Sequence, residues 1–198
     1  IGMTATPALQ TTEIFGDPVY TYSYQQAVLD GYLVDHDAPV IIKTKLAKEG
    51  IHFKKGTEVD IFDQDEKTIN KEKLPDNMNF DVKDFNHRVI TRNFNKVVCD
   101  ELVKKYLDPT DPYLGKTLIC AATDAHADMV VDLLKQAFKE QGRPVDDDAI
   151  EKITGSIRHP NQEIKNFKNE ENPNIVVTVD LLTTGIDVPR ITNIVFLR

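Results

Sequence analysis

From Asn86 onward, short continuous apolar runs alternate with longer sets of apolar residues at helical spacing. The continuous runs predict buried strands, because a strand covered on both faces needs apolar side chains on both. Such runs lie in Thr117–Ala122, Ile175–Val179 and Asn193–Leu197, and another strand is predicted at Ile150–Thr154. The spaced sets predict amphipathic helices from about Asn86 or Asn93 to Leu107, from Asp124 to Gln141 and from Asn161 to Phe167. The alternation of strand and helix predicts an α/β fold with a parallel sheet flanked by helices.

The pattern before Asn86 is different. A short helix is predicted from Tyr24 to Asp30, where Gly31 ends it. Alternating apolar residues within Pro39–Lys48 predict a strand, and Gly50–Asp63 is predicted to pair back on it as a hairpin. Charged residues and asparagine dominate Gln64–Asp84 without a sustained period, which predicts a loop or irregular insertion.

Composition narrows the class of protein. The chain has 198 residues, of which 40% are hydrophobic and 28% charged, as in an ordinary soluble globular protein. No apolar run approaches the roughly 20 residues that cross a bilayer. Cys99 and Cys120 lie in apolar segments without metal-site spacing, so both are predicted to be reduced core residues of a cytosolic protein. The net charge of −8 argues against a broad basic nucleic-acid surface, although amides and hydroxyls can still hold phosphates.

Both ends of the sequence suggest an internal segment of a longer polypeptide. The chain starts at Ile1 without an initiator methionine or a signal-peptide pattern, and it ends directly after the apolar run Ile194–Leu197. This expectation matters for function, because a complete active site could then be divided between this segment and the rest of the protein.

The richest segment for chemistry follows the strand predicted at Ile175–Val179. A loop at the carboxyl end of a parallel strand is where open α/β sheets bind ligands. Here that loop contains Thr183, Thr184, Gly185 and Asp187, which offer short polar side chains and a close backbone approach. An ordinary strand–turn–strand connection is the alternative interpretation of the same residues.

Several segments of the sequence resemble conserved motifs of one known family. Thr178–Pro189 resembles motif V of superfamily 2 helicases and DNA translocases, and Gly2–Pro7 resembles motif III, which closes the first motor lobe. Further matches point to the motor (R, or HsdR) subunit of type I restriction enzymes. These matches are Thr12–Gly16, Tyr22–Tyr24, Asp30–Leu33, Ala121–Ala127 and Ile153–Ser156. The resemblance covers most of the chain and is weakest from Ile51 to Phe85.

The resemblance implies three parts. Residues 1–35 would be the end of the first motor lobe with a connector, and residues 36–85 a β-hairpin-containing or irregular insertion. Residues 86–198 would be the second RecA-like helicase lobe, cut before motif VI and its arginine fingers. Those arginines normally stabilise the transferring phosphoryl group.

The resemblance also implies DNA-strand contacts. Thr123 and Asp124 form its motif IV, where a phosphate contact competes with a plain helix cap as the interpretation. Thr154 and Gly155, with the hydroxyl of Ser156, would make the next contact, or form only a turn. Thr178 and Thr183 of motif V complete the predicted DNA-binding set.

Other residues would line the ATP cleft or couple ATP hydrolysis to movement. Gly185 and Asp187 are implied at the ATP cleft, and Thr4 and Thr6 of motif III at the coupling of hydrolysis to movement. ATP and Mg²⁺ are expected in the full-length parent only, because no Walker A loop or acidic metal-binding box is present in this chain. The chain alone is therefore predicted to be catalytically inactive.

Two apparent signals are discounted. The triplet Gly115-Lys116-Thr117 resembles the tail of a phosphate-binding loop, but Thr110 stands where that motif needs glycine, and the triplet opens a strand. A simple turn is predicted there. The five histidines show no metal-ligand spacing, and a surface or cap role is predicted for His126.

The resemblance thus implies part of an ATP-dependent translocase motor, in a site-specific deoxyribonuclease of the bacterial or archaeal cytoplasm. Expected partners are double-stranded DNA and the specificity and methyltransferase subunits, with no membrane. Two alternatives remain: a lobe of another superfamily 2 DNA helicase, acting in repair or another restriction system, or a non-catalytic RecA-like module that binds DNA or a protein.

Overall fold

The computed structural model describes residues 2–4, 7, 9–42, 51–56, 58–63, 68–73, 76–80, 86, 90–108, 115–182 and 187–197. The chain divides into two compact units, Ile1–Ile41 and Ile42–Arg198. The boundaries predicted at residues 35 and 85 remain predictions.

The first unit contains two short helices, α1 (Leu9–Phe15) and α2 (Tyr24–Leu29). The helix predicted from Tyr24 is confirmed, and Ser23 caps it by accepting a hydrogen bond from the Gln26 amide at 3.1 Å. The helix α1 was not predicted. Its first turn has no acidic residue and its last turn no basic residue, so the usual charge signals of a helix are missing.

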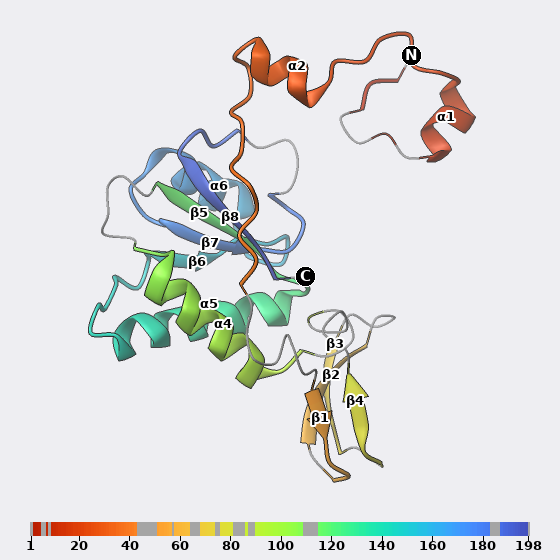
Figure 1. The fold of residues 1–198 in the computed structure, drawn as a ribbon. Coiled ribbons are helices and arrows are strands. Elements are labelled where there is room, and N and C mark those ends of the chain that lie inside the picture. The colour runs from red at the N-terminus through yellow and green to blue at the C-terminus, as the bar shows by residue number, and fades with distance from the viewer. Residues whose placement is uncertain are drawn as a thin grey trace. The chain divides into compact units, whose positions relative to one another are not determined.

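The second unit is built on a four-stranded parallel sheet with the order β6-β7-β5-β8. Its strands are β5 (Lys116–Cys120), β6 (Ile150–Lys152), β7 (Ile175–Thr178) and β8 (Ile191–Phe196). The helices around it are α4 (Arg92–Lys105), α5 (Asp124–Glu140) and α6 (Pro160–Asn169). The predicted α/β fold with its RecA-like parallel sheet is confirmed (Figure 1).

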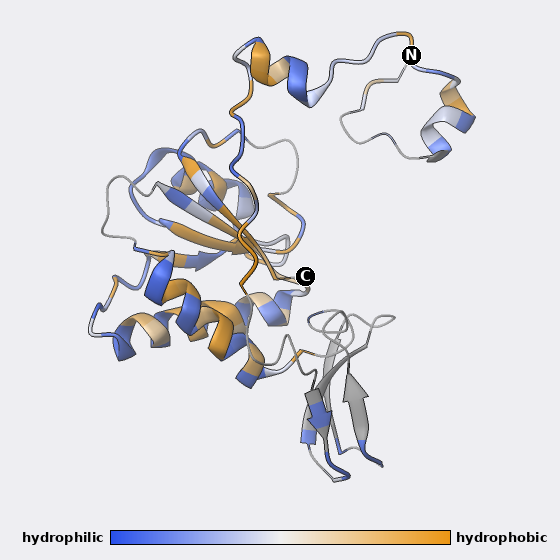
Figure 2. Cartoon of the chain, in the orientation of Figure 1, coloured by the Kyte–Doolittle hydropathy of each residue, from blue (hydrophilic) through white to orange (hydrophobic). Residues whose placement is uncertain are grey.

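The sheet buries both of its faces. Side chains alternate between faces along a strand, so Ile119 and Val177 point to one side and Leu118 and Val176 to the other. The first side packs against α4 and α5, and the second against Phe167 of α6. Figure 1 shows α4 and α5 together on one side of the sheet and α6 on the other. In Figure 2 the strands are largely apolar, while the helices also carry hydrophilic residues.

The segment before α4 corrects two predictions. Residues 39–42 form no strand, and the rest of the strand predicted at Pro39–Lys48 lies outside the described residues. The strand β2 (Glu58–Asp63) pairs with β3 (Thr68–Lys73), and β1 (Ile51–Phe53) pairs with β4 (Met78–Phe80), all antiparallel.

The hairpin was therefore predicted with the wrong partner, and the loop predicted at Gln64–Asp84 contains two strands. Residues 64–67, 74, 75 and 81–84 of that stretch lie outside the described residues. The strand β3 has the sequence TINKEK, whose charged and amide residues hide the apolar period on which the prediction relied. The register places Glu58 opposite Lys73, an opposite-charge pairing that suits two neighbouring strands.

Both cysteines are confirmed as core residues. Cys99 and Cys120 are free and buried, and burial raises the pKa of the Cys99 thiol to about 12. Such a thiol is protonated and unreactive at neutral pH. Among the described residues, no helix is both long and apolar enough to span a membrane.

Candidate functional site at the carboxyl edge of the sheet

The predicted strand-contact residues follow neighbouring parallel strands. Thr123 and Asp124 come after β5, Thr154 comes after β6, and Thr178 is the last residue of β7. These strands are adjacent and parallel, so their carboxyl ends share one edge of the sheet. Ligands of open α/β sheets bind at that edge.

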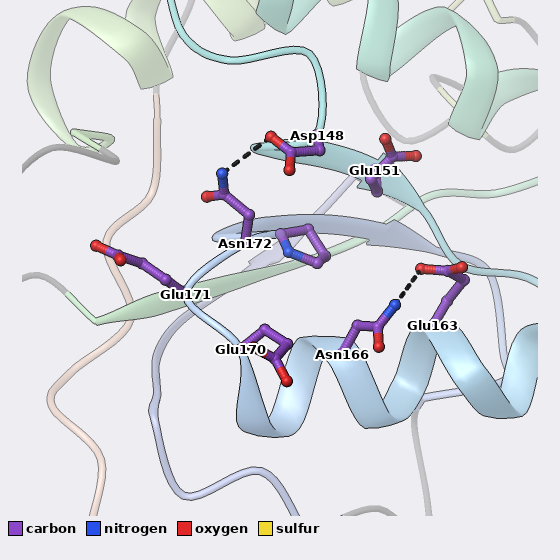
Figure 3. Close-up of a pocket in the computed structure, with 8 residues that line it drawn as sticks. Asp148, Glu151, Glu163, Asn166, Glu170, Glu171 and Asn172 are labelled. Carbon is purple, nitrogen blue, oxygen red and sulfur yellow. Dashed lines mark hydrogen bonds between the residues drawn. The ribbon is translucent and has the colours of Figure 1, made fainter.

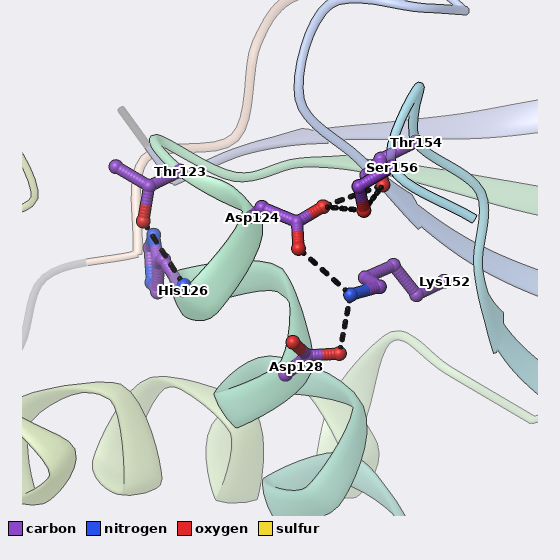
Figure 4. Close-up of polar contacts among 7 residues, drawn as sticks. All are labelled: Thr123, Asp124, His126, Asp128, Lys152, Thr154 and Ser156. Carbon is purple, nitrogen blue, oxygen red and sulfur yellow. Dashed lines mark hydrogen bonds and ion pairs between the residues drawn. The ribbon is translucent and has the colours of Figure 1, made fainter. Parts of the chain in front are cut away.

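Asp124 is the centre of a polar cluster at this edge (Figure 4). Its Oδ1 accepts hydrogen bonds from the Thr154 hydroxyl at 2.5 Å and from the Ser156 hydroxyl at 2.7 Å. Its Oδ2 accepts one from the Lys152 ammonium at 2.9 Å. Lys152 also pairs with Asp128 at 2.7 Å. The first turn of α5 is thereby tied to the segment that follows β6.

The cluster strongly favours an anion at the position of the Asp124 carboxylate. Partial burial alone would raise the pKa of Asp124, but the hydrogen bonds from Thr154, Ser156 and Lys152 outweigh it and lower the pKa to about 2. Asp124 and Asp128 together outweigh the one charge of Lys152, so the cluster has a formal charge of −1 (−2 + 1).

Thr123 has a different role from Thr154. Its hydroxyl accepts a hydrogen bond from the His126 amide at 3.0 Å, which makes Thr123 the N-cap of α5. The helix-cap interpretation of Thr123 therefore describes its geometry in this structure. The phosphate contact proposed for the same residue stays a prediction.

His126 corrects the surface role predicted for it. The imidazole is fully buried. Its Nδ1 accepts a hydrogen bond from the Ala122 amide at 3.1 Å, so the proton is on Nε2, which lies 3.0 Å from Asn95 Oδ1 and donates to it. Burial lowers the pKa of His126 to about 4, and the ring is neutral at pH 7.

Asn95 of α4 extends this buried network to two further residues. Its amide donates to Asn86 Oδ1 at 3.1 Å and to the Thr91 carbonyl oxygen at 3.0 Å. Asn95 was not predicted as a site residue, although the sequence contains a signal for it. It occupies a core position of α4 one turn before Val98 and Cys99, where an apolar residue is expected. A polar residue at such a position needs a buried partner.

Thr178 is buried and faces away from Asp124. Its neighbour Val177 packs on the α4 and α5 side of the sheet, so by alternation Thr178 points to the α6 side. Its hydroxyl has no hydrogen-bond partner among the described residues. The three predicted hydroxyls thus share an edge but do not converge on one point.

The structure describes some of the remaining predicted site residues, and others lie outside the described residues. Asp187 is 82% exposed and pairs with Lys168 at 3.1 Å, and Thr4 is exposed. A side chain added at Gly155 would meet nothing within 4 Å, and its contact role stays a prediction. Thr6, Thr183 and Gly185 lie outside the described residues.

The discounted triplet at the start of β5 forms a packed turn. Gly115 has φ +61°, and the buried Lys116 ammonium donates to the carbonyl oxygens of Glu171 at 3.0 Å and Pro173 at 2.6 Å. Burial, with the nearby charge of Arg190, lowers the pKa of Lys116 to about 8. Lys116 is thus engaged in the core and not in phosphate binding, while Thr110 lies outside the described residues.

A pocket of about 580 Å³ opens near the amino ends of β6 and β7 (Figure 3). It is lined by Asp148, Glu151, Glu163, Asn166, Glu170, Glu171, Asn172 and Pro173. The carboxylates that line the pocket repel phosphates. The pocket is therefore unsuited to the phosphate contacts expected at the carboxyl edge. In the part of the chain that the structure describes, no group of three or more acidic, histidine or cysteine residues could hold a metal ion.

Comparison with known proteins gives two curated relatives. The endonuclease subunit of the type I restriction enzyme EcoKI, from Escherichia coli strain K12, is 50% identical over 202 residues. That match covers 100% of this chain and 17% of the relative. The EcoAI endonuclease subunit, from Escherichia coli, is 29% identical over 193 residues, which cover 94% of this chain and 22% of the relative. No protein-family model matches the chain.

A solved structure supports the fold. It is a fragment described as an HsdR subunit of a type I restriction enzyme from Vibrio vulnificus YJ016, with a TM-score of 0.57 and 22% identity. The match covers 100% of this chain and 32% of that one. The chain thus spans only a part of each of these proteins. By sequence and fold, this chain is similar to a segment of type I restriction enzyme endonuclease (HsdR) subunits.

Proposed function

We propose that this chain is the second RecA-like lobe, with a connector from the first, of the ATP-driven DNA translocase motor of a type I restriction enzyme. The observation that carries this proposal is the 50% identity to the EcoKI endonuclease subunit along the whole chain. In this proposal the parent hydrolyses ATP with Mg²⁺, moves double-stranded DNA, and assembles with specificity and methyltransferase subunits. The chain alone does not turn over ATP.

Within that motor, the carboxyl edge contacts one DNA strand through its phosphates. The first turn of α5 supports this role, because the first amides of a helix lack intrahelical acceptors and favour an anion. Thr154 and Ser156 lie beside that turn and provide hydroxyl donors. Phosphate contacts carry no base sequence, which suits a motor that moves along any DNA.

The ATP cleft is assigned to the segment that follows β7. Asp187 is exposed next to residues 183–186, which lie outside the described residues, and its partner is a single surface lysine, Lys168. Such a pair is weak and can exchange for another cation or a ribose hydroxyl at little cost. In this proposal Asp187, with Gly185, contributes to nucleotide binding, and Thr4 and Thr6 couple hydrolysis to movement.

Replacing Thr154 by valine and Ser156 by alanine tests the strand contact. In the full-length subunit assembled with its partners, we expect DNA affinity to fall roughly tenfold, because each hydrogen bond contributes about 0.5–1.5 kcal/mol net. Displacement of a triplex-forming strand from linear DNA should consume more ATP per base pair moved. The loss should be the same on unrelated DNA sequences.

Asn172→Ala provides the matched control. It removes a side-chain hydrogen bond, to Asp148 at 2.9 Å, near the amino ends of the strands. This variant should bind and move DNA like the wild type. Unchanged affinity and ATP consumption in the Thr154 and Ser156 variant would contradict the proposed contact, and would leave these hydroxyls with a turn-forming role only.

A further inference from the structure

The donors assigned to the DNA strand are already occupied by an acceptor from the same chain. The hydroxyls of Thr154 and Ser156 both donate to one carboxylate oxygen of Asp124, at 2.5 and 2.7 Å. Lys152 donates to the other oxygen at 2.9 Å. Figure 4 shows the side chains of Lys152, which ends β6, and of Thr154 and Ser156, which follow it, pointing toward the carboxylate.

A DNA phosphate and this carboxylate require the same donors. Each hydroxyl has a single proton to donate, so it cannot serve Asp124 and a phosphate oxygen at full strength together. The Lys152 ammonium is shared further with Asp128, at 2.7 Å. The cluster also has a formal charge of −1, from two carboxylates and one ammonium, and this charge repels a phosphodiester.

Building on the proposed function, we propose that Asp124 is an internal competitor for the DNA backbone, which holds the donors of Thr154 and Ser156 until a phosphate displaces it. When the phosphate leaves, the carboxylate takes the donors back. The contact is thereby kept weak and easily released. A motor that advances along DNA needs this property, because a strand held too tightly at one step delays the next.

The exposure of Asp124 fits such an exchange. Its side chain is 44% exposed, whereas that of Lys152 is 18% exposed. The carboxylate can therefore turn toward water without unpacking the core, while Lys152 stays in place to meet a phosphate. The low pKa of Asp124, about 2, also keeps it charged and competing throughout the neutral range.

Asp124→Asn tests the competition in the full-length subunit. The substitution keeps the size of the side chain and removes its charge. Fluorescence anisotropy with a labelled DNA duplex, without ATP, should give a Kd roughly fivefold lower than that of the wild type, the factor of about one net hydrogen bond. Asp124→Ala removes the acceptor altogether and should give at least the same gain. Weaker or unchanged binding in both variants would overturn the proposal and make Asp124 a positioning residue.

Two controls separate competition from a general effect of charge. Asp128→Asn removes a carboxylate from the same cluster but leaves both hydroxyls on Asp124, so its Kd should change far less. Asp124→Asn added to the Thr154→Val and Ser156→Ala variant should give a clearly smaller gain, because Lys152 is then the one donor of this cluster that the substitution frees. An equal gain in Asp128→Asn, or a full gain in the combined variant, would overturn the proposal.

The same measurements distinguish this inference from the proposed function. If the Thr154 and Ser156 variant binds DNA as tightly as the wild type, the strand contact itself is wrong, and the competition fails with it. If that variant binds more weakly but neither Asp124 variant binds more tightly, the strand contact stands and only the competition is wrong.

Discussion

Gly115→Ala is expected to destabilise the 198-residue chain by about 3 kcal/mol. Gly115 has φ +61°, a conformation that costs a residue with a side chain about 1–2 kcal/mol. An added Cβ would also lie 2.6 Å from the Thr192 side chain and 2.8 Å from the Arg190 carbonyl oxygen. Because that oxygen accepts the Lys116 amide, relief would require β5 to separate from the turn before β8. Overpacking of this kind adds about 1–3 kcal/mol.

Gly142→Ala separates strain from crowding. Gly142 has φ +70°, but an added Cβ would meet nothing within 4 Å. The free energy of unfolding of this variant should fall only by the conformational cost, about 1 kcal/mol. The urea midpoints should therefore decrease in the order wild type, Gly142→Ala, Gly115→Ala. Equal midpoints for the two variants would show that the turn before β5 is not packed as the structure has it.

The second large effect is a loss of stability in mild acid that depends on His126. Its pKa is about 4 in the folded chain, whereas the ordinary pKa of a histidine side chain, which applies to the unfolded chain, is 6.5. Between these values the unfolded chain binds more protons, so stability falls as the pH falls from 6.5 to 4. The full difference corresponds to about 3 kcal/mol, at 1.36 kcal/mol for each pKa unit.

Urea unfolding of the wild type and of His126→Asn at pH 7 and pH 5 measures this effect. Asparagine does not titrate, so the variant should be less stable at pH 7 but should lose much less between the two pH values. Asp124 does not interfere, because its pKa moves from 3.8 to about 2 and its contribution is lost only below that window. The same pH dependence in both proteins would contradict the assignment of a neutral, buried imidazole.

The sequence predicted the sheet well and the hairpins poorly, for a physical reason. The strands β5 and β7 are buried on both faces, and their apolar runs are visible without knowledge of any partner. The strand β3 has only one apolar residue, Ile69, so its pairing is not visible in its own pattern. The pairing of β3 depends on the complementarity of its side chains with those of β2. The pattern of apolar residues along β3 does not show this complementarity.

The candidate site shows the same limit. The sequence placed Thr123, Thr154 and Thr178 after or at the ends of parallel strands, which is where the structure has them. It could not show that the Thr154 hydroxyl donates to a carboxylate 30 residues away, or that Thr178 points to the other face. Those facts depend on the alignment of strands and on side-chain direction. The surface role predicted for His126 was wrong because its buried partner, Asn95, lies on another helix.

Hydrogen–deuterium exchange on the full-length subunit, with and without a DNA duplex, tests the central claim most directly. If the carboxyl edge holds a DNA strand, amides of residues 123–126 and 154–157 should exchange more slowly with DNA bound, because phosphate oxygens accept from the first turn of α5 and the loop after β6. Residues 170–174, beside the acidic pocket, should exchange at an unchanged rate. Slower exchange at residues 170–174, with no change at the carboxyl edge, would contradict the account.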